Sequence, residues 1–362
     1  MNVQRNKISF SGQRVFVGID IHKKSWDVTA MTSGGYVKSC HQPASATALL
    51  EFLNRHFPQG DYLAVYESGF SGFSTYYALT GLGVRCLIIN AADLSSTQYE
   101  RVMKSDRVDS ARLARELLKD GERIKGRVYV HSRENLDDRS LLRLRTTMRK
   151  QWNGYQSRIK HLLHCNGVEI PPRFGGSDAR WTKAFRSWLG GEEVELLSPG
   201  RQTLDFLLSV EERLRAQVLE LTGKIRRLSR EPRYSAPCAR LMTIPGVGLL
   251  TAMSILLEIE DPRRFGNEKR FASYLGLVPT SHSSGERVSN GEMTFRGNHW
   301  LGAMVMESAW VAIRRDSALA SVYGKALKSM PPAKAIVKVA RKISNRIRAV
   351  LMGKEDYIYA KC

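Results

Sequence analysis

Val15-Phe-Val-Gly-Ile-Asp20-Ile-His-Lys-Lys-Ser-Trp-Asp-Val-Thr-Ala30 is the stretch from which the architecture of the N-terminal region can be inferred. Its first half is apolar and rich in β-branched residues, which favour strands, and it ends on one carboxylate, Asp20, where the predicted strand begins to turn. A second extended run covers Ser25 to Met31, and Ser33-Gly34-Gly35 predicts a turn into a third, Tyr36 to Cys40. The sequence therefore predicts a three-stranded meander with an acidic residue early in it.

Two sheet architectures begin with such a meander and an early Asp: the ATPases of the actin and sugar-kinase type, and the nucleases of the ribonuclease H superfamily. The ATPases need Gly and Thr or Ser directly after the Asp, so that backbone amides can surround a phosphate. Ile21-His22-Lys23 stands there instead, which favours the nuclease. The order predicted downstream is helix, strand, helix, strand and helix, over residues 45–57, 62–66, 71–82, 84–89 and 104–118. Three meander strands followed by right-handed crossovers give the ribonuclease H order.

The charge of the chain predicts its partner. In 362 residues, Lys and Arg outnumber Asp and Glu by 56 to 35, and the formal net charge of +21 is spread along the whole sequence. Such a field attracts a polyanion. An anionic membrane is the alternative, but no apolar run approaches the ~20 residues of a spanning helix and no signal peptide is recognisable. Nucleic acid, and no membrane, is therefore the expected partner, and the length suffices for two or three domains.

The five cysteines do not suggest a disulfide framework or a zinc site. They are scattered at positions 40, 86, 165, 238 and 362, and no two of them form a CxxC pair. The sequence therefore predicts a cytosolic protein.

Long charged helices are predicted from Ser132 to about Arg230, interrupted near Pro171-Pro172 and Gly175-Gly176. Apolar residues at mostly three-and-four spacing form a seam in the second half of this region: Leu207, Leu214, Val218, Leu221, Ile225 and Leu228. The seam indicates either a coiled coil between chains or an intramolecular hairpin with the helix near residues 136–163. Both alternatives are kept.

In the C-terminal third, helical patterns over residues 236–242 and 249–258 flank Ile244-Pro-Gly-Val-Gly248, which is typical of a helix-hairpin-helix. Gly246 and Gly248 would permit a tight turn whose free amides bind a phosphate. A polar loop is expected over residues 280–298, followed by helices over residues 300–315 and 332–352. The last helix carries a basic face that either binds phosphates or is merely solvated: Lys334, Lys338, Arg341, Lys342 and Arg348.

Four acidic residues are the candidates for chemistry: Asp20, Glu67, Asp106 and Asp109. Asp20 and Glu67 end strands that are neighbours in the predicted topology, and Asp106 and Asp109 share one helical face. Converging carboxylates repel one another unless hard cations neutralise them, which implies Mg²⁺. Two such ions can activate the attacking oxygen and stabilise the leaving oxygen of a phosphodiester. The alternative is that each acid only serves a helix dipole or a turn.

Six motifs, taken together, resemble one family: Gly18-Ile-Asp20-Ile-His-Lys, Tyr66-Glu67-Ser-Gly, Lys104-Ser-Asp106-Arg-Val-Asp109-Ser-Ala, Ile244-Pro-Gly-Val-Gly, Tyr274-Leu-Gly-Leu-Val-Pro and Ser284-Gly. In this order they are similar to the insertion-sequence transposases with a RuvC-like DEDD domain, the bridge-RNA-guided serine recombinases. The resemblance covers nearly the entire chain. It implies an α/β RNase H-like (RuvC-like) domain over residues 1–131, a coiled-coil insertion over 132–235, and a mainly α-helical transposase domain with the helix-hairpin-helix over 236–362.

The resemblance also implies a serine nucleophile, which is the serine before glycine and hence Ser284, with Ser283 as the adjacent alternative. Without the family, this loop would be taken for a flexible surface turn. The basic stretch that follows the serine in the family is partly kept here as Arg287 and Arg296, while Glu286 and Glu292 reduce its charge.

The implied activity is that of an RNA-guided DNA recombinase of a bacterial mobile element, acting in the cytoplasm at the nucleoid. It would cut and rejoin strands of donor and target double-stranded DNA through a phosphoserine intermediate assisted by Mg²⁺ and directed by a structured bridge RNA. The implied assembly is a homo-oligomer, from dimer to tetramer. Two alternatives remain open: a RuvC-type metal-dependent junction endonuclease without a covalent intermediate, and a non-catalytic nucleic-acid scaffold.

Overall fold

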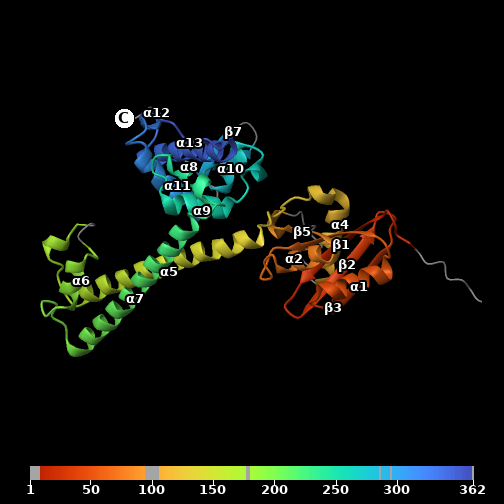
Figure 1. The fold of residues 1–362 in the computed structure, drawn as a ribbon, viewed down its shortest axis with the longest axis horizontal. Coiled ribbons are helices and arrows are strands. Elements are labelled where there is room, and N and C mark those ends of the chain that lie inside the picture. The colour runs from red at the N-terminus through yellow and green to blue at the C-terminus, as the bar shows by residue number, and fades with distance from the viewer. Residues whose placement is uncertain (1–8, 94–105, 177–179, 285–286, 294–295, 361–362) are drawn as a thin grey trace, which may run out of the picture. The chain divides into compact units, whose positions relative to one another are not determined.

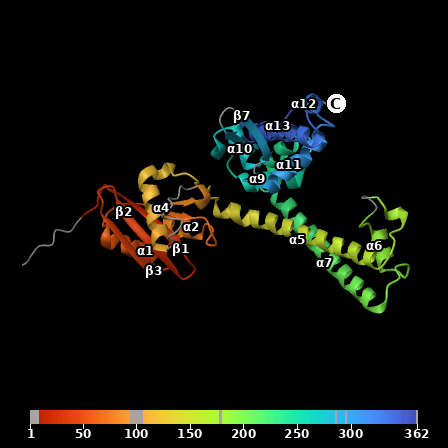
Figure 2. The same ribbon diagram turned by 180° about the vertical axis from the view of Figure 1, so that it is seen from behind.

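The computed structural model describes residues 9–93, 106–176, 180–284, 287–293 and 296–360, and for residues 91, 106–107, 279–284 and 287–293 it describes the backbone alone. The chain divides into two compact units, Met1–Val130 and His131–Cys362 (Figures 1 and 2). The predicted boundary after residue 131 lies next to this division. The predicted boundary after residue 235 lies inside the second unit.

The first unit is built on a mixed five-stranded sheet of order β3-β2-β1-β4-β5. The antiparallel meander consists of β1 (Arg14–Ile21), β2 (Ser25–Thr32) and β3 (Val37–Pro43). On its other side β1 pairs in parallel with β4 (Asp61–Glu67), which pairs in parallel with β5 (Arg85–Ile89). The predicted mixed α/β sheet is confirmed, and it is compatible with an RNase H-like domain.

Helices cover both faces of this sheet, because successive side chains of a strand point to opposite faces. Val15, Val17 and Ile19 of β1 lie in the core that α1 (Ala46–His56) and α2 (Ser74–Gly81) cover. Phe16 lies in the opposite core, against Leu113 of α4 (Asp106–Asp120). Figure 2 shows α4 crossing the sheet on that face. Side chains at even-numbered positions of β1 therefore face α4.

Gly18 allows α4 to lie directly on β1. A Cβ at this position would collide with the Ser110 carbonyl oxygen and would lie 2.5 Å from the Ala114 nitrogen. Both obstructing atoms belong to the backbone of α4, so no side-chain rotation can relieve the clash. A residue with a side chain could be accommodated only if the whole helix moved away from the sheet.

We therefore expect Gly18→Ala to destabilise the first unit by about 1–3 kcal/mol, the usual cost of overpacking a tight core. The measurement is the melting temperature, which should fall. Gly34→Ala is the matched control, because a Cβ there would meet only the Thr32 hydroxyl at 3.8 Å. If Gly18→Ala melts as the wild type does, α4 does not lie this close to β1 in solution.

The second unit begins with a helical hairpin. In both views α5 (Arg133–Cys165) and α7 (Ser198–Leu228) lie side by side, and α6 (Lys183–Gly190) lies at the end where they are joined. The seam of α7 is buried at five positions: Leu214, Val218, Leu221, Ile225 and Leu228. Since α7 packs along α5 of the same chain, the seam has the partner that the hairpin alternative assigned to it.

The remaining helices of the second unit share one hydrophobic core. They are α8 (Ser235–Met242), α9 (Leu249–Ile259), α10 (Glu268–Tyr274), α11 (His299–Ala312), α12 (Ser317–Leu327) and α13 (Pro332–Gly353). Over the described residues, no helix combines the length and the apolar character that crossing a membrane requires.

The expectation of a polar loop over residues 280–298 was wrong for most of this segment. Strands β6 (Pro279–Ser284) and β7 (Arg287–Met293) pair there as an antiparallel hairpin. Serine, glycine and asparagine have weak strand propensity, so the composition indicated a loop. Pairing of two adjacent segments uses backbone groups, however, and does not require apolar side chains.

Candidate active site

Asp20 and Glu67 lie on neighbouring parallel strands, near the carboxyl end of each. Ile19 pairs with Tyr66, so Asp20 and Glu67 are the next residues along the two strands. Asp20 follows Gly18 by two positions and Glu67 follows Val65 by two, and both therefore face α4. The Asp20 side chain is 26% exposed and the Glu67 side chain 36%, so solvent and a ligand can reach both carboxylates.

Arg112 of α4 joins the Glu67 and Asp109 carboxylates. Its Nη2 lies 2.7 Å from Glu67 Oε1 and 4.0 Å from Asp109 Oδ1. The Arg112 side chain is 14% exposed, and among the described residues its buried Nε has no hydrogen-bond partner. The structure thus brings Asp109 to the sheet edge that carries Glu67, with a guanidinium between them. Sequence analysis missed Arg112 because an arginine in a charged helix is usually solvated.

Asp27 is a further carboxylate that sequence analysis missed. It lies directly opposite Asp20 in the β1–β2 register, and like charges in such a pair destabilise a sheet. Each of the two acids has a histidine beside it: Asp27 Oδ2 lies 3.0 Å from His41 Nδ1, and Asp20 Oδ2 lies 3.3 Å from His22 Nε2. A prediction of the β1–β2 register, residue by residue, would have placed Asp27 beside Asp20.

Among the cysteines, Cys40 is the closest in sequence to Asp27. Burial, and then the charge of Asp27, raise the pKa of Cys40 to about 11. The thiol therefore stays protonated near neutral pH and does not supply a thiolate to the site.

Asp106 is the first residue of α4, but its side chain lies outside the described residues. Among the side chains that the structure does describe, no group of three His, Cys, Asp or Glu could hold a metal ion as they stand. The donors nevertheless suit a hard divalent cation, because carboxylate oxygens are its preferred ligands. Arg112 supports this fit, because its guanidinium shows that a positive charge is accommodated between Glu67 and Asp109.

Ser284 is the last residue of β6 and pairs with Arg287, the first residue of β7. Ser283 pairs with Val288. The side chains of these serines and of Arg287 lie outside the described part of the chain. The serines belong to the second unit and the acids to the first.

A buried carboxylate anchors the segment that follows the β6–β7 hairpin. Glu258 of α9 is 2% exposed and accepts a hydrogen bond at 3.2 Å from Nδ2 of Asn298, the residue that caps α11. Arg143 of α5 donates to both Glu258 oxygens, at 2.8 and 2.9 Å. The base of the hairpin is thereby tied to the long helix α5. Glu258 could have been noticed in the sequence as the single acid of an apolar helix.

The turn between α8 and α9 contains the two glycines assigned to phosphate binding. Gly246 has φ +86° and a Cβ there would collide with the Ser308 carbonyl oxygen of α11, while Ser308 Oγ donates to the Gly246 oxygen at 2.9 Å. Packing against α11 is thus sufficient to require a glycine at 246. Gly248 is exposed and immediately precedes α9, where a helix N-terminus offers free amides.

One face of α13 packs against the core, and the opposite face is exposed and basic. Ile336, Val339 and Ile343 are buried in the core, whereas the predicted phosphate contacts Lys334, Lys338, Arg341 and Lys342 are exposed. Arg348 differs from them, because its Nη2 donates to the Gly266 carbonyl oxygen at 3.4 Å. Arg296, just after the hairpin, is also exposed.

The chain is similar to known transposases over both units. One family model, DEDD_Tnp_IS110, described as a transposase, matches residues 17–165, and a second, described as the transposase IS116/IS110/IS902 family, matches residues 238–324. A Sinorhizobium fredii protein, y4qE, whose name describes it as a transposase, is 25% identical over 82% of this chain and 72% of its own length. The transposase for insertion sequence element IS1111A of Coxiella burnetii is 25% identical over 78% of this chain and 75% of its own.

A third relative, the transposase for insertion sequence element IS1533 of Leptospira borgpetersenii, is 24% identical over 69% of this chain and 70% of its own. The first family model contains the Asp20, Glu67 and Asp109 edge together with Arg112, and the second contains the β6–β7 hairpin and Ser284. Domains of the first type normally use divalent metal ions. The chain is therefore a DNA transposase, with two regions similar to the IS110/IS116 transposases.

Proposed function

We propose that this transposase is an RNA-guided recombinase that cuts and rejoins DNA strands through a phosphoserine at Ser284, with Mg²⁺ held by Asp20, Glu67, Asp106 and Asp109. Two observations support the proposal: Asp20 and Glu67 end neighbouring parallel strands on the face toward α4, and Arg112 of α4 lies near the carboxylates of both Glu67 and Asp109. A helix cap or a turn would explain one such carboxylate, but it would not explain three carboxylates on three different elements.

The proposed reaction is a transesterification. Ser284 Oγ attacks the scissile phosphorus and loses its proton, the Oγ–P bond forms, and the P–O3′ bond breaks to leave a 3′ hydroxyl. Rejoining reverses these steps with another strand's 3′ hydroxyl, so no external energy source is needed. The bound cation would supply positive charge at the attacking and leaving oxygens. Glu67 would exchange its contact with Arg112 for the cation, which frees the guanidinium to pair with a phosphate oxygen.

The proposed partners are donor and target double-stranded DNA and a structured bridge RNA. Base pairing would select the sequence, while the protein would bind backbones through Arg287 and through exposed cations such as Arg296 and those of α13. Gly248, with the turn before α9, would contribute a helix-hairpin-helix contact to phosphate. We further propose a homo-oligomer, dimer to tetramer, in which the serine of one subunit can meet the acids of another.

The exposed face of α13 gives a prediction about binding. Lys338→Glu with Arg341→Glu should lower the slope of log affinity against log salt for duplex DNA by about 0.9 for each phosphate that the helix no longer neutralises. Lys325→Glu with Lys328→Glu is the matched control, because these residues, in the last turn of α12 and directly after it, are also exposed and the change in net charge is the same. Fluorescence anisotropy titrations at several salt concentrations measure the slope. Equal slopes for both double variants would show that the α13 face does not contact DNA.

A second candidate function is that of a junction endonuclease with a metal-activated water as nucleophile. The observation in its favour is that the carboxylates assemble within the first unit, without any residue of the second. The two functions differ in their products. Incubation of the protein and its co-purified RNA with donor and target DNA should give recombinant strands and protein-linked DNA, whereas hydrolysis alone would give free nicked ends.

A further inference from the structure

The middle of α5 is strongly and uniformly basic. From Arg139 to Cys165 the sequence holds seven Lys or Arg residues and no Asp or Glu. A solvated helix usually mixes both charges, which stabilise it through pairs three or four residues apart. This segment lacks such pairs within itself. Arg139 and Arg143 pair instead with Glu258 of α9, near the start of the segment.

A groove lies on this basic segment, between α5 and α7. It has a volume of about 580 Å³, and it is lined by Lys150, Gln151, Gly154, Tyr155 and Arg158 of α5 and by Val210 and Leu214 of α7. Lys150 and Arg158 are exposed, and neither forms an ion pair with another described residue. The groove thus combines two available cations with an aromatic ring and an amide.

Gly154 lines the groove and lies in the interior of α5. Glycine is the least favourable residue after proline inside a helix, so its presence there indicates a close approach by another group. Packing among the described residues does not demand it, because a Cβ there would meet only Arg158 Nη1, at an ordinary contact distance of 3.6 Å. The space above the Gly154 backbone is therefore left for something other than the protein's own side chains.

Arg158 and Tyr155, which both line the groove, contact each other. The Arg158 guanidinium lies over the Tyr155 ring, 4.9 Å from its centre. A guanidinium held flat in this way presents its outer face for stacking and its N–H groups for hydrogen bonds to phosphate. Lys150, on the turn before Gly154, can hold a neighbouring phosphate as a point charge.

We propose that this groove binds one unpaired nucleotide of a single-stranded nucleic acid. The base stacks on the Arg158 guanidinium above Gly154, Gln151 bonds to its edge, and Lys150 and Arg158 contact the flanking phosphates. Duplex DNA does not fit this mode, because its bases are already stacked inside the helix. The site is independent of the chemistry proposed for Ser284 and of any guide sequence.

Gly154→Ala is the most specific test, because it changes no charge and should improve the helix. Full-length protein, freed of nucleic acid by high salt, is titrated with fluorescein-labelled 12-nucleotide single strands of RNA and DNA and with a 12-base-pair duplex. We expect the variant to melt no lower than the wild type and to bind single strands on the order of tenfold more weakly. Its affinity for the duplex should be unchanged.

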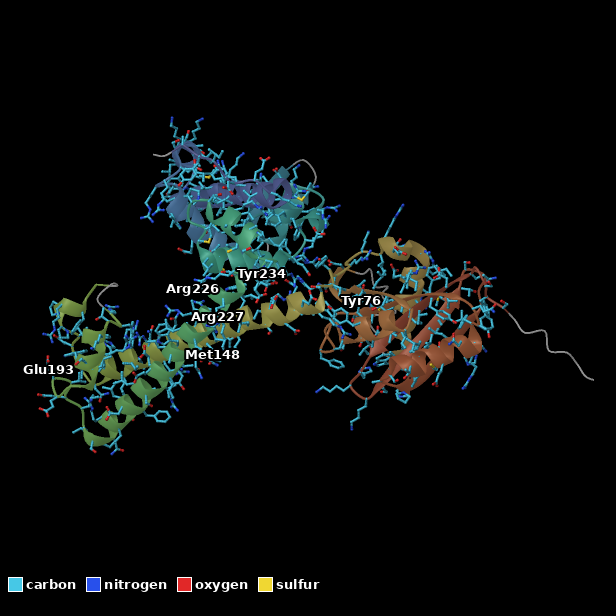
Figure 3. All side chains as sticks on the ribbon, in the orientation of Figure 1. Tyr76, Met148, Glu193, Arg226, Arg227 and Tyr234 are labelled. Carbon is cyan, nitrogen blue, oxygen red and sulfur yellow. The ribbon has the colours of Figure 1, made fainter. Side chains whose placement is uncertain are left out.

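Lys150→Gln with Arg158→Gln tests the charge, and Arg226→Gln with Arg227→Gln is the matched control. The control residues, labelled in Figure 3, are exposed on α7 roughly three turns from Leu214. The groove variant should lower the single-strand salt slope by about 0.7 for each phosphate that is no longer neutralised, and more than the control does. The proposal is overturned if Gly154→Ala binds single strands like the wild type, or if both double variants weaken single strands and duplex alike.

Discussion

Ser284→Ala should abolish the covalent protein–DNA adduct and all recombination, while binding of RNA and DNA is retained. The reason is that only a side-chain oxygen at this position can form the ester, and alanine has none. The variant should otherwise fold normally, because β6 pairs with β7 through backbone groups that the substitution leaves in place. The measurement is a denaturing gel of protein incubated with labelled DNA, on which the wild type gives a slow adduct band.

Ser283→Ala is the control for this experiment. It removes the same hydroxyl from the neighbouring position, which pairs with Val288 and is not the serine before glycine. We expect a mild effect, with adduct and recombinants still formed. If Ser283→Ala is the inactive variant, the nucleophile is Ser283. If both single variants still recombine DNA, the serine mechanism fails and the metal-activated water takes its place.

Asp20→Asn should lower DNA cleavage by on the order of a hundredfold or more, the loss typical when a preorganised charge in an active site is removed. Asparagine keeps the size of the side chain and can still bond to His22, but it loses the negative charge that attracts a divalent cation. Binding of RNA should change little. Cleavage rates with Mg²⁺, together with the rise in melting temperature that Mg²⁺ causes, measure the two effects separately.

Asp61→Asn is a suitable control for this substitution. Asp61 also lies on β4 and bonds to Arg85, but it is at the opposite end of the strand from Glu67. It should leave cleavage intact. Were Asp20→Asn to cleave at the wild-type rate with an unchanged response to Mg²⁺, the acids would have a structural role only.

The placement of Asp20 and Glu67 could be predicted because it depends on local patterns. Apolar β-branched runs mark β1 and β4, and the topology makes their ends neighbours. Asp27 and Arg112 could not be assigned in the same way, since their roles depend on strand register and on how α4 lies over the sheet. That position is set by Gly18, whose missing side chain matters only once α4 is in contact with it.

Other features of the structure could not be predicted from a single sequence. The seam of α7 showed that a helix would pack on another helix, but a leucine repeat does not say whether its partner is in the same chain. The β6–β7 hairpin was mistaken for a loop because its residues have weak strand propensity. Glu258, which ties the base of that hairpin to Arg143, involves residues more than a hundred positions apart.

The central claim is that a phosphodiester is transferred to the Ser284 oxygen, and peptide mass spectrometry of the trapped adduct tests it most directly. After nuclease and trypsin digestion, the fragment of residues 271–287 contains Ser273, Ser281, Ser283 and Ser284, and fragmentation distinguishes them. The account predicts a nucleotide remnant joined through its 5′ phosphate to Ser284. An unmodified fragment from protein that has cut its DNA, or a remnant on a different residue, would contradict it.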